Sequence, residues 1–91
     1  MDRLDAFHTF VTVAEAGGFS AAARKLRLSP AAVTRSVAAL EAELGVQLFR
    51  RTTRVVALTE EGSRFLVSAR RILADTEASM AGVREMDTAL R

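Results

Sequence analysis

The last third of this 91-residue sequence is a proline-free run with the apolar periodicity of a single long helix. Thr59 is a suitable N-cap for it, and Glu60 and Glu61 follow where the positive end of the helix dipole favours carboxylates. Continued to about Leu90, some 30 residues at 1.5 Å each form a rod of about 45 Å. The residues that precede it can form only a small body, so we expect one helix to project from that body.

Apolar side chains recur every three or four residues along residues 59–91 and form one stripe. A second copy of the helix would cover the projecting part of this stripe by symmetry. The alternatives are a frayed tail, or a linker that packs on another domain. Thr76, Ser79 and Asp87 interrupt the stripe and favour a short or antiparallel contact over a long parallel zipper. The residues expected at the dimer interface are Leu66, Ala69, Leu73, Met80, Val83 and Leu90.

Two short helices are predicted near the amino terminus. Apolar residues at steps of three and four predict an amphipathic helix over residues 3–16, which Gly17-Gly18 ends. Ser20 is a candidate N-cap for a second helix over residues 21–27, whose small side chains allow close packing.

A third helix has clear signals at both ends. Ser29 is a good N-cap, Pro30 is favoured at the first helical position, and Gly45 can end the helix in a left-handed turn. One side of this helix is predicted to face the core through Val33, Val37, Leu40 and Leu44.

The other side of the third helix has unusually small side chains. An ordinary solvent-exposed face would favour Glu, Lys and Gln, whereas a helix that lies deep in a groove needs short side chains and one or two long polar probes. A merely alanine-rich exposed helix is the alternative interpretation. The residues on this face are Ala31, Arg35, Ala38 and Ala42, flanked by Thr34.

A hairpin is predicted after the third helix. Val46, Leu48 and Phe49 return the chain to the core, and two short extended runs, 49–51 and 55–58, flank the polar residues 52–54. No Gly or Asn stands at the tip, so the turn type stays open. We interpret this hairpin as a candidate wing.

Basic residues are concentrated in the middle of the chain. Residues 24–54 contain seven basic and two acidic residues, a net charge of +5, whereas the segments before and after it have net charges of −2 and −1. Such local basicity indicates an anionic partner at one surface, with a solvated charged face as the alternative.

Several function classes are disfavoured by composition. The chain has no Cys, and a single imidazole, that of His8, cannot build a metal site. No glycine-rich phosphate loop or supported nucleophile is present, so we expect no enzyme and no cofactor. The amino terminus has no signal-peptide pattern and no apolar stretch approaches 18 residues, which predicts a cytoplasmic protein that does not bind membranes.

Two helices joined by a tight turn, the second with a slim face, followed by a basic hairpin, indicate a winged helix-turn-helix. The sequence also resembles the amino-terminal DNA-binding domain of the LysR-type transcriptional regulators. The runs that carry this resemblance are "FSAAARKL", "VTRSVAALEAELGVQLF", "RTTR" and "LTEEG". They predict a mainly α chain with a winged helix-turn-helix over residues 1–58 and a linker helix for dimerisation over residues 59–91.

The resemblance implies a nucleoid-associated protein, with residues that contact double-stranded DNA. The third helix would enter the major groove, and its Arg could bond guanine O6 and N7. The wing would enter the minor groove, and helix N-termini would meet phosphates. Positions that match the family's base contacts are Pro30, Ala31, Thr34 and Arg35. Positions assigned to phosphates or to the wing are Ser20, Ser29, Arg50, Arg51, Thr53 and Arg54.

The resemblance further implies a homodimer, paired antiparallel through the last helix, that binds a dyad-symmetric site. Family members continue into a larger effector-binding domain, and we expect this chain to be a part that lacks it. Two rival interpretations remain at this point. The first is a winged-helix module for protein association without a specific DNA site, although such a helix should show aromatic or aliphatic anchors. The second is a purely structural helical dimer, which leaves the basic hairpin unexplained.

Overall fold

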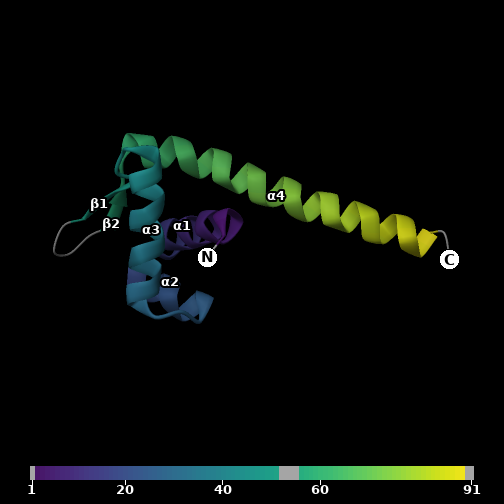
Figure 1. Ribbon diagram of the computed structural model, residues 1–91, viewed down its shortest axis with the longest axis horizontal. Coiled ribbons are helices and arrows are strands. Elements are labelled where there is room, and N and C mark those ends of the chain that lie inside the picture. The colour runs from purple at the N-terminus through teal and green to yellow at the C-terminus, as the bar shows by residue number, and fades with distance from the viewer. Residues whose placement is uncertain (1, 52–55, 90–91) are drawn as a thin grey trace.

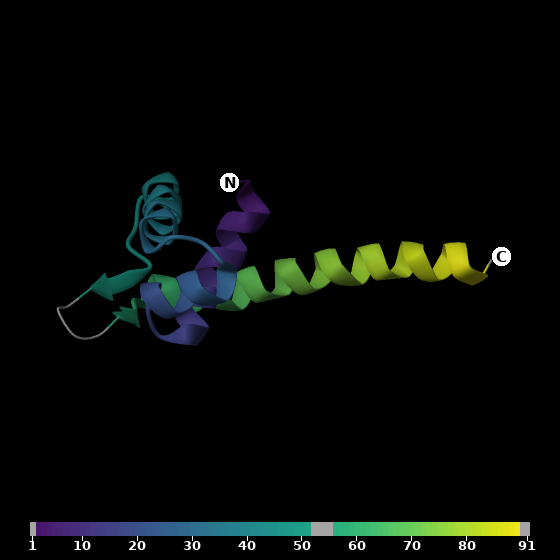
Figure 2. The same ribbon diagram turned by 90° about the horizontal axis from the view of Figure 1, so that it is seen from below.

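The computed structural model describes residues 2–51 and 56–89. It confirms the predicted winged helix-turn-helix with a long final helix (Figures 1 and 2). The two strands pair antiparallel, and Phe49 lies opposite Leu58. The elements are α1 (Arg3–Ala16), α2 (Phe19–Leu26), α3 (Pro30–Leu44), β1 (Phe49–Arg51), β2 (Val56–Leu58) and α4 (Glu60–Ala89).

Most helix ends are fixed by the local chemistry that the sequence predicted. Gly17 and Gly45 adopt left-handed conformations, at φ 77° and 73°, and end α1 and α3. The Ser29 hydroxyl accepts the Ala32 N–H at 3.1 Å, which caps α3. The Thr59 hydroxyl accepts the Gly62 N–H at 2.9 Å and caps α4 in the same way.

The start of α2 differs from the prediction. The helix begins at Phe19 instead of residue 21, and Ser20 lies inside its first turn and is not its N-cap. Gly18 occupies the cap position and makes no side-chain cap bond. The Phe19 ring packs against Phe49 at a centroid distance of 5.8 Å, so tertiary packing anchors this first turn where cap chemistry does not.

The core lies between the three short helices, the hairpin and the first half of α4. Phe10 is fully buried at its centre, and its ring lies 5.3 Å from both Phe49 and Phe65. Leu66 and Ala69 of α4 are also buried in this core. The first half of α4 therefore completes the domain instead of merely following it.

Two residues expected in the core are exposed. Leu44 and Val46 keep 43% and 38% of their surface accessible. They line a shallow hollow of about 370 Å³ between the end of α3 and α4, together with Leu48 and Phe65. The prediction for Leu44 and Val46 was wrong because the chain turns at Gly45, at the edge of the body, and the described residues leave both side chains partly open to solvent.

The second half of α4 projects from the body (Figure 1). The chain measures 56 × 26 × 19 Å along its principal axes, and the hairpin and the end of α4 lie at opposite ends of the long axis (Figure 2). Among the described residues, no helix has the length and apolarity needed to cross a bilayer.

Candidate nucleic-acid interface

The residues predicted to read bases lie together on one exposed face of α3. Pro30, Ala31, Thr34 and Arg35 are all exposed, whereas the opposite side of the helix is buried through Val33, Val37 and Leu40. This arrangement follows from the helical period, since residues three and four apart share a face.

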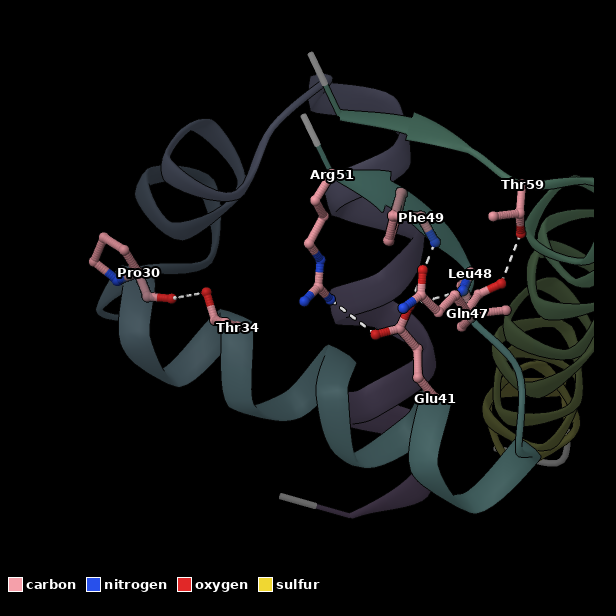
Figure 3. Close-up of polar contacts among 8 residues, drawn as sticks. All are labelled: Pro30, Thr34, Glu41, Gln47, Leu48, Phe49, Arg51 and Thr59. Atoms are coloured by element: carbon pink, nitrogen blue, oxygen red, sulfur yellow. Dashed lines mark hydrogen bonds and ion pairs between the residues drawn. The ribbon is translucent and has the colours of Figure 1, made fainter. Parts of the chain in front are cut away.

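The polar groups on this face are few. The Thr34 hydroxyl donates to the Pro30 carbonyl at 2.9 Å, so its lone pairs and methyl group remain available to a ligand (Figure 3). Within the described residues, Arg35 forms no ion pair. The guanidinium of Arg35 is therefore the one long cationic probe on an otherwise small-residue surface.

The two serines predicted near phosphates have different environments. Ser29 is exposed, but its hydroxyl oxygen already accepts the Ala32 N–H. Ser20 is exposed in the first turn of α2, whose backbone N–H groups receive no side-chain cap from Gly18. The first turn of α2 thus presents backbone donors, together with a serine hydroxyl, that could face an anion.

Exposed cations flank α3 on both sides. Arg24, Lys25 and Arg27 are exposed at the end of α2, and Arg50 is exposed on β1. Of the basic residues that the structure describes between 24 and 51, only Arg51 forms an ion pair. Thr53 and Arg54 of the predicted wing lie outside the described residues.

Arg51 differs from the other predicted phosphate contacts. Its Nη2 donates to Glu41 Oε1 at 2.8 Å (Figure 3). Its guanidinium lies 5.0 Å from the centre of the Phe19 ring. Sequence reasoning missed Glu41, which it counted only as a negative charge. No local pattern on α3 indicates its contact with β1, because that contact depends on how the chain returns after Gly45.

The residues predicted for dimerisation divide into two groups. Leu66 and Ala69 are buried in the core of the chain itself, so we remove them from the predicted interface. Leu73 is half-buried, while Met80 and Val83 are exposed on the projecting half of α4. Leu90 lies outside the described residues.

The pattern of the family described as "Bacterial regulatory helix-turn-helix protein, lysR family" matches residues 4–63. This match extends from α1 into the first turn of α4, so it includes the whole candidate interface. The chain belongs to the LysR family. The expected family resemblance is thereby confirmed.

Individual LysR-family proteins are similar to the chain over most of its length. HTH-type transcriptional regulator ClcR of Pseudomonas putida is 53% identical over 70 residues, which are 77% of this chain and 24% of ClcR. HTH-type transcriptional regulator CrgA of Neisseria meningitidis is 48% identical over 80 residues, or 85% of this chain and 27% of CrgA. The chain spans about a quarter of the length of these curated relatives.

A solved protein–DNA complex has the same fold as this chain. The crystal structure of the BenM DBD with catB site 1 DNA superposes with a TM-score of 0.90 at 32% identity, and the match covers 96% of each chain. The CbnR DBD–DNA complex gives a TM-score of 0.81 at 43% identity and covers 98% of this chain and 99% of that chain.

Proposed function

We propose that this LysR-family chain is the module that reads duplex DNA in a transcriptional regulator. In this proposal α3 lies in the major groove and the hairpin reaches the minor groove. The observation that carries it is the exposed, small-residue face of α3, on which Arg35 has no ion-pair partner among the described residues. The BenM and CbnR domains, which share the fold of this chain, are each solved in complex with DNA, and this supports DNA binding by the chain.

The dimensions of the groove explain why the face of α3 is small. A helix with its side chains is about 10–12 Å wide and the major groove is about 12 Å wide, so bulky side chains on the leading face would hold the backbone out. Ala31, Ala38 and Ala42 keep that face thin. Arg35 can then reach a guanine edge, where two parallel hydrogen bonds distinguish G from the other bases.

We further propose that two chains pair through the projecting half of α4 and bind a dyad-symmetric site. One face of α4 packs on the body, and the same face continues into the projecting half of the helix. Leu73, Met80 and Val83 lie on this continuation and support the proposal. A symmetric partner supplies the same face in return.

Selection of bound duplexes from a random pool tests both proposals, because an inverted repeat requires base reading and pairing together. A pool without enrichment would contradict base reading.

The substitution Arg35→Ala should weaken binding to the selected duplex by about 1–3 kcal/mol and flatten the preference at one base position. Random duplex should lose little, since phosphate contacts stay in place. Fluorescence anisotropy on both duplexes measures the two losses. Arg71→Ala on α4 is the matched control, because it removes the same charge from an exposed position away from α3. Equal losses on selected and random DNA would reject base reading by Arg35.

Removal of Arg50 tests the predicted phosphate contacts. We expect Arg50→Ala to weaken binding to all duplexes and to reduce the slope of log K against log salt by about 1, because one fewer counterion is released. Titration at several salt concentrations measures the slope. Arg64→Ala is the control, since Arg64 is paired with Glu60 on α4. An unchanged slope for Arg50→Ala would place β1 off the DNA.

A further inference from the structure

One carboxylate joins α3 to the hairpin. Oε2 of Glu41 accepts the backbone N–H of Leu48 at 2.7 Å and lies 3.4 Å from that of Phe49. Its other oxygen accepts from Arg51 at 2.8 Å (Figure 3). The Glu41 side chain keeps only 12% of its surface exposed. A single group on α3 therefore holds three donors from β1 and the residue before it.

The same contact extends to α2. The Arg51 guanidinium that donates to Glu41 lies over the Phe19 ring, so α2, β1 and α3 meet at this point. The ring contacts of β1 are with the two helices before α3, since Phe49 packs against Phe10 and Phe19. Among the described residues, the hydrogen bonds that connect the hairpin to the helix proposed to read DNA are thus those of Glu41.

We propose that Glu41 is a positioning residue, whose carboxylate sets the angle between the hairpin and α3 so that both reach adjacent grooves of one duplex. This inference rests on the proposed function. In this proposal Arg51 mainly orients the hairpin through its bond to Glu41. Arg50 then contacts a phosphate, and Arg54 enters the minor groove.

The chemistry of the site requires a carboxylate. All three groups that face Glu41 are donors, and an ionised carboxylate only accepts. In Glu41→Gln one oxygen becomes an NH₂ group, which would face either the guanidinium or a backbone N–H. One of the two connections must then be lost, although the side chain keeps its length and shape.

Glu43 provides a matched control on the same helix. Its side chain pairs with Arg3 of α1, is 55% exposed and makes no hydrogen bond to the described part of the hairpin. Glu41→Gln and Glu43→Gln therefore change the net charge of the chain equally, so a difference between them does not come from net charge.

The first measurement uses the intact chain without DNA. Amide residual dipolar couplings report the orientation of β1 and β2 relative to α3. In Glu41→Gln, the couplings of the strands and of α3 should no longer fit the parent structure with one common alignment tensor. In the parent and in Glu43→Gln, both sets of couplings should fit that structure with one tensor. Unchanged couplings in Glu41→Gln would overturn the proposal. If Glu41→Gln does not fold, Glu41→Asp takes its place, because it keeps the charge and is too short by one methylene to hold all three donors.

The second measurement is a double-mutant cycle on the selected duplex. In the parent and in Glu43→Gln, Arg54→Ala should weaken binding by about tenfold. In Glu41→Gln the same change should cost less than about threefold, because the hairpin is already displaced. An equal loss in both backgrounds would overturn the positioning role. A parent that binds no duplex would instead overturn the proposed function, and the dipolar couplings keep these two failures apart.

Discussion

Replacement of Gly62 by Ala should lower the melting temperature of the chain by about 15 °C or more, which corresponds to about 3 kcal/mol for a domain of this size. Gly62 lies in the first turn of α4, where the helix passes directly over the backbone of Leu48. A Cβ atom at Gly62 would lie 2.0 Å from the Leu48 carbonyl oxygen and 3.1 Å from Leu58 Cδ2. A separation of 2.0 Å between a Cβ atom and a carbonyl oxygen is a severe steric clash, so the backbone would have to move.

The clash at Gly62 cannot be relieved by a side-chain rotation, because the atom it meets is backbone. The Leu48 carbonyl also accepts the Thr59 N–H at 3.0 Å, so movement of α4 would break that bond. Overpacking alone costs about 1–3 kcal/mol, and each lost hydrogen bond adds about 1 kcal/mol. Thermal unfolding followed by circular dichroism, at one protein concentration, measures the loss.

Gly82→Ala is the matched control for Gly62→Ala. It makes the same change in the interior of the same helix, at a position where a Cβ would meet no atom within 4 Å. Ala is favoured over Gly by about 1 kcal/mol in a helix interior, so Gly82→Ala should raise the melting temperature by a few degrees. Similar melting temperatures for the two variants would contradict the close approach of α4 to Leu48.

The features that the sequence predicted well are those decided by neighbouring residues. Gly17, Ser29, Gly45 and Thr59 end or begin helices through bonds within a few residues of themselves, so their patterns suffice. The exposed face of α3 was predictable for the same reason, because one helical period sets both its buried and its exposed side.

The features that were missed depend on where distant segments lie. The role of Glu41 requires the backbone of residues 48 and 49 to pass its carboxylate, which no local pattern on α3 indicates. Leu66 and Ala69 continue the same stripe as Val83, so periodicity cannot tell where the body ends and the projecting helix begins.

Val83→Glu should convert the proposed dimer into monomers at micromolar concentration. Val83 is 67% exposed in the single chain, on the same stripe of α4 as Met80 and Met86. A two-fold dimer would bury two of the introduced carboxylates, one from each chain, and burial of an unpaired charge is costly. We expect the dissociation constant to rise about 100-fold or more, which sedimentation velocity measures against the parent.

Two of the three polar residues within this stripe, Thr76 and Ser79, do not oppose pairing. The Thr76 hydroxyl donates to the Ile72 carbonyl and the Ser79 hydroxyl to the Asp75 carbonyl, each at 2.8 Å. Both donors are therefore satisfied within α4, so burial against a second helix would leave neither without a partner.

Val67→Glu separates burial of the stripe from a general effect of charge. Val67 is 58% exposed on the same helix, but 16 residues from Val83 at 100° each, which places it about 160° around the helix axis. The same substitution there should leave the dimer intact. Dissociation by both variants would indicate that net charge opposes association, and dissociation by neither would mean that this stripe faces something other than a second copy. Only loss of the dimer in Val83→Glu alone agrees with pairing through the projecting half of α4.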